Sequence, residues 1–292
     1  LPKGNSKDVG GKVSLEIAQR VGAKSIVLLK NRNKVLPIDI KNTKSIALIG
    51  PNAKIARLDG FGSAEVEPTR RISPYKGLKD RAPGVKIKYN PGNNIEDAVK
   101  LAKKSDVVIF IGGLDRTQEG EGYGIGGDRK GRSVQLPRDQ QKMIKALKEA
   151  NKEVIVVIKS GGITALKYCI DDIDGLLYAF YPGQEGGYAI ADALLGNINP
   201  GGKLPVTMPV DDSQLPIWNN KNFENDIVDG FGYRRYDSLN IEPEFYFGYG
   251  LSYTDFTIDN LSIIPNITDT EVNIGVKVDV TKLETSSQAD YY

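Results

Sequence analysis

Short, near-continuous apolar runs recur along the first two thirds of the chain and alternate with segments of helical period. The runs are rich in Val, Ile and Leu, as in strands that are buried on both faces of a sheet. They occupy residues 25–30, 45–50, 85–89, 107–112, 154–159 and 175–181. Helical spacing is clear at residues 13–21, 95–103 and 139–150, and a further helix is expected at 188–195. This alternation predicts an α/β fold, a mainly parallel sheet sandwiched by helices.

The composition changes after Met208-Pro209. Residues 213–250 are rich in Asn, Asp, Gly and aromatic side chains and show no clean period, whereas residues 272–280 alternate as a strand does. We therefore expect an α/β domain over residues 9–212, an aromatic-rich connector over 213–250 and the start of a small all-β domain over 251–292. Only about 40 residues follow Leu251, too few for a complete sandwich of roughly 100 residues.

The composition excludes several kinds of site within the chain. It has no histidine and one cysteine, Cys169, which excludes a Ser-His-Asp triad, a Cys-His pair, a histidine metal site and an internal disulfide. The net charge of +2 does not suit a nucleic-acid binder. No apolar run has the length of a membrane span. We expect no metal, no cofactor, no nucleic-acid partner and no membrane partner.

The polar loop that follows the run at 107–112 is the first candidate for chemistry, because ligands of open α/β sheets bind beyond the carboxyl ends of strands. It carries four carboxylates beside two arginines, namely Asp115, Glu119, Glu121, Asp128, Arg116 and Arg129. Carboxylates that an enclosed pocket desolvates can exchange protons near neutral pH. The alternative is a solvated acidic loop with local ion pairs, and the spacing leaves both interpretations open.

For three other motifs we favour an interpretation without a binding or catalytic role. Gly122, Gly124 and Gly127 match a dinucleotide-binding pattern, but no strand immediately precedes them and no helix opens on them. Glu185 could contact a ligand, but we favour a structural role at a helix N-terminus. The aromatic residues at 233–236 and 245–249 could stack on sugars, but we favour packing between domains.

Five blocks of the sequence resemble successive blocks of glycoside hydrolase family 3, in the family's order, across residues 12–255. They lie at residues 25–31, 46–53, 181–187, 199–207 and 247–254. The resemblance implies an N-terminal (β/α)8 barrel, absent from this chain, an α/β sandwich and a fibronectin type III-like domain, of which this chain holds only the beginning. It implies no cofactor, and this chain alone is expected to be inactive.

The resemblance also implies a retaining mechanism, with an aspartate nucleophile on the barrel and an acid/base glutamate on the sandwich loop. It favours Glu121 as the acid/base, with Glu119 as second choice, because residues 123–126 widen the spacing to the following Asp-Arg pair. Asp128 and Arg129 match that pair and are expected to orient the loop.

The implied substrate is a β-linked oligosaccharide or an aryl glycoside. Residues 59–68 resemble a block of β-glucosidases and residues 118–122 resemble some β-xylosidases, so we expect a β-glucosidase first and a β-xylosidase second. A different class, a non-catalytic carbohydrate-binding or interaction domain, is the alternative. The sequence leaves open whether the enzyme forms a homodimer and in which compartment it acts.

Overall fold

A computed structural model describes residues 8–60, 62–119, 133–151, 153–216, 230–268 and 270–283. Its helices are α1 (Lys12–Ser25), α2 (Pro74–Arg81), α3 (Ile95–Ala102), α4 (Arg138–Ala150), α5 (Gly186–Leu194) and α6 (Tyr233–Leu239). Its strands are β1 (Val27–Asn31), β2 (Ser45–Ile49), β3 (Lys86–Asn90), β4 (Val107–Gly113), β5 (Val154–Lys159), β6 (Gly175–Tyr178), β7 (Phe256–Ile267) and β8 (Val272–Lys282). Within the described residues, no helix is long and apolar enough to cross a membrane.

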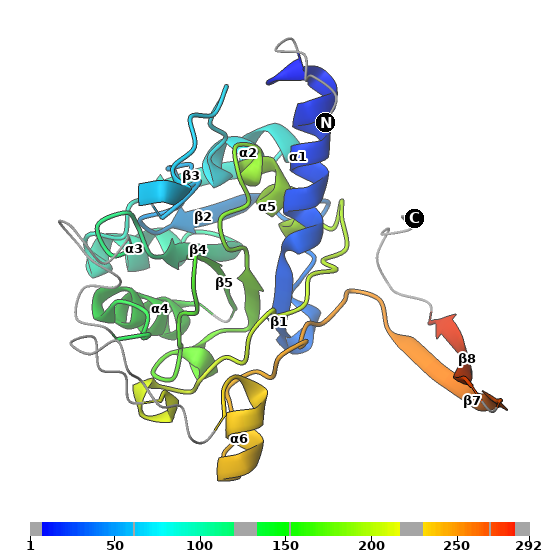
Figure 1. The fold of residues 1–292 in the computed structure, drawn as a ribbon. Helices are drawn as coiled ribbons and strands as arrows, with labels where there is room; N and C mark the ends of the chain where they lie inside the picture. The colour runs from blue at the N-terminus through cyan, green and yellow to red at the C-terminus, as the bar shows by residue number, and fades with distance from the viewer. Residues whose placement is uncertain are drawn as a thin grey trace.

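The first six strands form one sheet in the order β1-β6-β5-β4-β2-β3 (Figure 1). All neighbours in it run parallel except β1, which lies antiparallel to β6 at one edge. An antiparallel edge strand on an otherwise parallel sheet is common in α/β proteins. The predicted α/β class with a mainly parallel sheet is confirmed. The orientation of β1 was not predicted, because an apolar run carries no direction.

Helices cover the sheet on both faces, and the strands alternate between two apolar layers. On β5, Ile155 and Val157 pack in the layer that holds Ala23 of α1, Leu78 of α2 and several residues of α5. Val154, Val156 and Ile158 belong to the other layer, with Ala98 of α3 and Met143, Ile144 and Leu147 of α4. This two-sided burial explains why the strands read as continuous apolar runs.

Helix α1 confirms the predicted helix but leaves its apolar stripe on the surface. Val13, Ile17 and Val21 are 68%, 45% and 60% exposed. The helix is joined to the α/β body through its last turn, where Gly22 and Ala23 are buried.

The aromatic-rich segment that follows the sheet packs onto the α/β body. Phe245 and Tyr249 lie against the layer that contains α3 and α4. Met208 and Phe245 form an antiparallel bridge, and the Leu251 amide donates to the Leu28 carbonyl. Helix α6 lies in this segment and was not predicted, because it is short and shows no apolar period.

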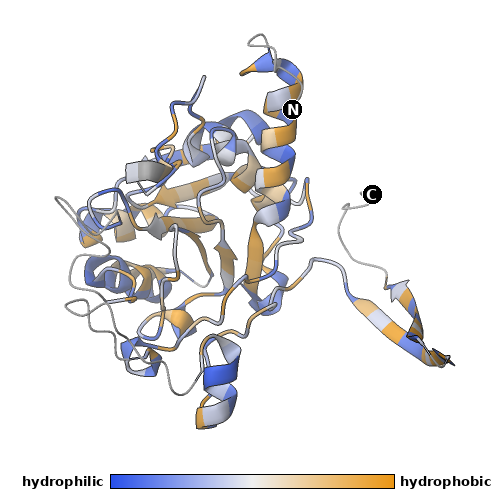
Figure 2. Cartoon of the chain, viewed as in Figure 1, coloured by the Kyte–Doolittle hydropathy of each residue, from blue (hydrophilic) through white to orange (hydrophobic). Residues whose placement is uncertain are grey.

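Strands β7 and β8 form an antiparallel hairpin that projects from the α/β body in Figure 1. The predicted strand at 272–280 is confirmed within β8. Apolar side chains of the hairpin, such as Ile263 and Val276, are more than 60% exposed. The colouring in Figure 2 places hydrophobic residues along the hairpin. A two-stranded hairpin has no core of its own. Its assignment to a fibronectin type III-like domain stays a prediction.

Helices α2 and α5 cross with their backbones in direct contact, which requires glycine at the crossing. A Cβ on Gly77 would lie 2.0 Å from the Gly187 carbonyl oxygen, and one on Gly187 would lie 2.2 Å from the Ser73 oxygen. Ser73 caps α2, and Pro74 occupies the first turn. The sequence analysis missed α2, although Ser-Pro is a helix-start signal.

We expect Gly77→Ala to destabilise the protein, because the new methyl group would push the two helices apart. Overpacking of this kind costs about 1–3 kcal/mol. Gly84→Ala is the matched control, because a Cβ at this exposed glycine would meet nothing within 4 Å. Urea unfolding of both variants measures the difference. Equal unfolding midpoints for the two variants would contradict the close crossing.

Candidate active site

The carboxyl ends of β4, β5 and β6 lie side by side because the three strands are paired in parallel. Gly113 is the register partner of Lys159, and Ile158 is the partner of Tyr178. The chain segments that leave these strands therefore converge at one edge of the sheet. The loop that the sequence singled out begins there, after β4.

The carboxylate of Glu119 lies in a cradle made by the segments after β5 and β6, which we call the Glu119 cradle: Ser160, Gly161, Gly162 and Tyr181. Its Oε1 accepts a hydrogen bond from the Gly162 amide at 3.1 Å and lies 3.0 Å from the Ser160 hydroxyl. Its Oε2 accepts from the Gly161 amide at 2.9 Å and from the Tyr181 hydroxyl. All four of these groups can donate to a carboxylate.

Tyr178, the last residue of β6, and Ser160, just after β5, hold the cradle in place. The Tyr178 hydroxyl donates to the Gly162 carbonyl at 2.7 Å, and the same oxygen lies 2.8 Å from the Ser160 hydroxyl. Because Ser160 has a single hydroxyl proton, it can serve Glu119 or Gly162 at any one time. Phe180 has a φ of 49°, a left-handed conformation that a non-glycine residue adopts at a cost. This turn lies immediately before Tyr181.

Burial raises the pKa of Tyr181 well above its usual value, and the hydrogen bond to Glu119 raises it further. The phenol therefore stays protonated across the physiological range. It acts as a permanent donor to the carboxylate.

A second network joins the loop after β4 to the segment after β2. Arg57 lies 3.5 Å from Asp115 and donates to the side-chain oxygen of Asn52 at 3.1 Å. The Asn52 amide lies within hydrogen-bonding distance of two carbonyl oxygens at the end of β4, those of Gly112 and Leu114. These contacts hold the start of the loop against the segment that carries Arg57.

Arg116 pairs with Glu65 at 2.6 Å. The sequence analysis considered local ion pairs as the alternative for this loop. The ion pairs Arg57–Asp115 and Arg116–Glu65 join the loop to residues 57–65, which overlap the block at residues 59–68 that resembles β-glucosidases.

Three predicted site residues, Glu121, Asp128 and Arg129, lie outside the described residues. Their assignments stay predictions. Of the two candidates for the acid/base, the structure describes only Glu119, the second choice, which lies beyond the carboxyl end of β4.

Glu185 has a structural role, but through Arg70 and not through the helix-capping contact that was expected for it. Its carboxylate is fully buried and forms a bidentate ion pair with Arg70, with both contacts at 2.5 Å. Glu185 is the N-cap residue of α5, but its side chain makes no capping hydrogen bond. The arginine partner, more than 100 residues away in sequence, could not be identified from the motif.

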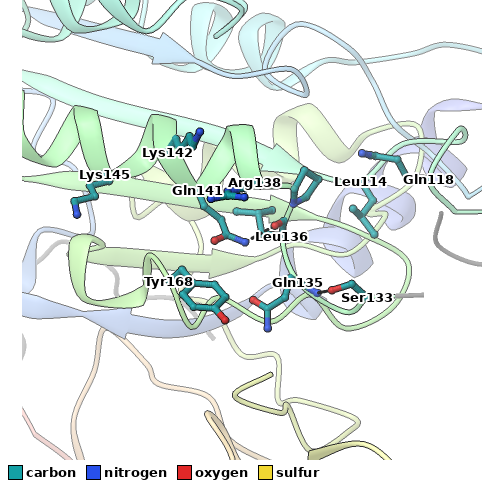
Figure 3. A pocket seen from close by; sticks show the side chains of 11 residues that line it. Leu114, Gln118, Ser133, Gln135, Leu136, Arg138, Gln141, Lys142, Lys145 and Tyr168 are labelled. Carbon is teal, nitrogen blue, oxygen red and sulfur yellow. Dashed lines mark hydrogen bonds between the residues drawn. The ribbon is translucent and has the colours of Figure 1, made fainter. Parts of the chain in front are cut away.

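A pocket of about 850 Å³ opens beside α4 (Figure 3). Gln118 and Ser133, from the two ends of the loop, line it together with Arg138, Lys142 and Tyr168. The full lining is Leu114, Gln118, Ser133, Gln135, Leu136, Pro137, Arg138, Gln141, Lys142, Lys145 and Tyr168. None of these described residues belongs to the Glu119 cradle.

Lys159, at the end of β5, is a buried cation that the sequence analysis treated only as part of a strand. It is 2% exposed and forms no ion pair with another described residue. Burial, and then the positive charge of Arg57, lowers its pKa to about 7. A charge at this position therefore works against folding.

The stability of the protein should rise with pH because of Lys159. Its folded pKa lies below its unfolded value of 10.5, so between about pH 7 and pH 10.5 the unfolded chain binds more protons. One such group changes the free energy of unfolding by at most about 1.4 kcal/mol per pH unit. Below about pH 7 Lys159 is protonated in both the folded and the unfolded state, so the full free-energy cost of burying its charge opposes folding.

We expect Lys159→Met to be more stable than the wild type at pH 7 and this advantage to shrink toward pH 9.5. Urea unfolding at a series of pH values measures it. Lys104→Met, at an exposed position, is the control for loss of one charge. An advantage of Lys159→Met that is constant with pH would show that the lysine does not titrate in this range.

Comparison with known proteins places this geometry in a family. The model of the glycosyl hydrolase family 3 C-terminal domain matches residues 26–253. The chain is 37% identical over 281 residues to "Thermostable beta-glucosidase B" of Acetivibrio thermocellus, covering 90% of this chain and 36% of that protein. It is 35% identical to a "Beta-xylosidase" of Formosa agariphila, covering 91% of this chain and 38% of that protein.

Among solved structures, the fold matches the beta-D-glucoside glucohydrolase of Trichoderma reesei with a TM-score of 0.82 and 27% identity. That match covers 92% of this chain and 43% of the other. The chain thus spans less than half the length of each of these three proteins. The family match, the relatives and the shared fold agree, and the chain belongs to glycoside hydrolase family 3 as a C-terminal α/β domain.

Proposed function

We propose that this chain is the acid/base-bearing part of a retaining β-glucosidase that removes terminal non-reducing β-D-glucosyl residues. The observation that carries the proposal is the position of Glu119. Its carboxylate is bound at the carboxyl edge of the sheet, two residues before Glu121, at the start of the loop on which a proton donor is expected. Membership of the family and the names of the relatives support a glycoside hydrolase.

The proposed reaction needs two carboxyl groups. An aspartate on a barrel domain attacks the anomeric carbon while Glu121 protonates the departing glycosidic oxygen. The resulting glycosyl-enzyme is then hydrolysed by a water from which Glu121 removes a proton. For this retaining chemistry the two carboxyl groups lie about 5–5.5 Å apart in the assembled site. Asp128 and Arg129 are proposed to orient the loop.

The surroundings of Glu119 support the choice of Glu121 as the donor. Both oxygens of Glu119 accept hydrogen bonds from backbone amides, and the protonated Tyr181 adds another. These donors hold both oxygens of Glu119 against the chain itself. A general acid must instead carry its proton to the leaving group.

A β-glucoside is the proposed substrate and a β-xyloside is the second candidate. The relatives reported above include a protein named for each activity, at 37% and 35% identity. The structural match reported above is to a glucoside hydrolase. The activity of this chain is proposed to require the barrel domain, since it spans only 36% of the first of these relatives.

The test is a kinetic comparison of wild type and Glu121→Gln in the longer enzyme that includes a barrel domain. With alkyl or weakly activated aryl β-glucosides, we expect kcat/KM to fall about 100- to 10,000-fold, because general acid catalysis is lost. Activated aryl glucosides should lose less in the glycosylation step, because their leaving groups need no proton. Added azide should restore turnover by replacing the activated water and should yield a β-glycosyl azide.

Glu149→Gln, the same change on the exposed side of α4, is the control and should match the wild type. A Glu121→Gln enzyme with wild-type activity on poor leaving groups would refute the assignment. A higher kcat/KM for aryl β-xylosides than for β-glucosides would favour the second substrate. Saturable sugar binding without any hydrolysis would support a non-catalytic carbohydrate-binding domain instead.

A further inference from the structure

We propose that Glu119 is a positioning residue: its carboxyl group ties the start of the loop after β4 to the segments that follow β5 and β6. This tie would keep the proposed proton donor, which lies two residues further along the sequence, in the same place in every catalytic cycle. The inference rests on the proposed function for its effect on catalysis, but the tie itself involves only described residues.

The chain just before Glu119 is already a closed turn. The amides of Gln118 and Glu119 both donate to the Asp115 carbonyl at 2.9 Å. The Asp115 carboxylate accepts from the amide of Thr117 at 2.8 Å and from its hydroxyl at 2.6 Å. This turn fixes the backbone of Glu119 relative to the end of β4, so its side chain can transmit a restraint.

The side chain of Glu119 then makes the connection to the neighbouring strands. Its two oxygens contact different groups of the Glu119 cradle, two on Oε1 and two on Oε2. Consecutive backbone amides that converge on an anion form a nest, a recurrent way to bind negative charge. With the turn on one side and the cradle on the other, position 119 is restrained from both the backbone and the side chain.

Two glycines leave room for this arrangement. A Cβ on Gly161 would lie 3.1 Å from the Tyr181 ring and 3.5 Å from Oε2 of Glu119. A Cβ on Gly60 would lie 3.5 Å from the Cβ of Glu119. Glu119 is therefore packed between the segments that follow β2 and β5. Part of the glycine-rich block at 59–68 thus contacts the loop through Gly60.

A positioning residue and a proton donor predict different kinetics. If Glu119 only positions the loop, its loss displaces the donor for every substrate, whatever the leaving group needs. If Glu119 is the donor, its loss is selective for poor leaving groups and azide restores turnover. Glu119→Gln keeps the size of the side chain but sets an NH2 group against at least one donor of the cradle.

In the longer enzyme, we expect Glu119→Gln to lower kcat/KM about 10- to 100-fold for activated and poor leaving groups alike, as displacement of a catalytic group does. Azide should give no rescue, and both limbs of the pH–rate profile should remain. Tyr181→Phe removes one donor without adding a polar group, so it should act in the same direction with a smaller loss. Glu149→Gln is the control.

Trypsin gives a readout that does not need activity, because residues 120–132 contain Arg129, Lys130 and Arg132. We expect cleavage within 120–132 to be several-fold faster in Glu119→Gln than in wild type and unchanged in Glu149→Gln. The same longer enzyme serves for this measurement. Circular dichroism of each variant separates local release from global unfolding, and Tyr181→Phe serves if Glu119→Gln does not fold.

Two results would overturn the inference: wild-type kinetics and cleavage in both Glu119→Gln and Tyr181→Phe, or azide rescue of Glu119→Gln with loss of a pH limb. Faster cleavage in Glu119→Gln together with an unaffected Glu121→Gln would refute the proposed donor while supporting the tie. The two failures are therefore distinguishable.

Discussion

Parallel pairing of β4, β5 and β6 is the constraint on which the site depends. It directs the carboxyl ends of all three strands to one edge, so the segments that leave them are neighbours although they are far apart in sequence. Glu119 comes from the first of these segments, the Ser160–Gly162 amides from the second and Tyr181 from the third. The two apolar layers hold this register, because a shift along any strand would expose its buried side chains.

The buried Glu185 and Lys159 and the partly buried Glu119 show how the fold accommodates charged groups. Glu119 and Glu185 each have donors for both carboxylate oxygens, from backbone amides and hydroxyls in one case and from Arg70 in the other. Lys159 has no ion-pair partner among the described residues, and its pKa falls to about 7. Buried charge is tolerated where donors or opposite charges compensate it, and otherwise the group tends to neutralise.

Much of the fold was predictable because buried strands and helices show as runs or periodic patterns of apolar residues in the sequence. The six apolar runs correspond to the six strands of the sheet, and the helices α1, α3, α4 and α5 lie where their period placed them. The antiparallel direction of β1 and the short helices α2 and α6 were missed. Strand direction depends on the partner strand, and α2 and α6 bury too few apolar side chains to show a helical period.

The sequence by itself determined the α/β class, the order of the elements, the location of the polar loop after β4 and the family resemblance, since each depends on residues close together along the chain. Only the tertiary structure decided that Glu119 is bound by residues 41–62 positions away and that Glu185 pairs with Arg70. Spacing shows that two glutamates lie two residues apart on one loop. Which donors surround the first of them is fixed by the strands packed beside it.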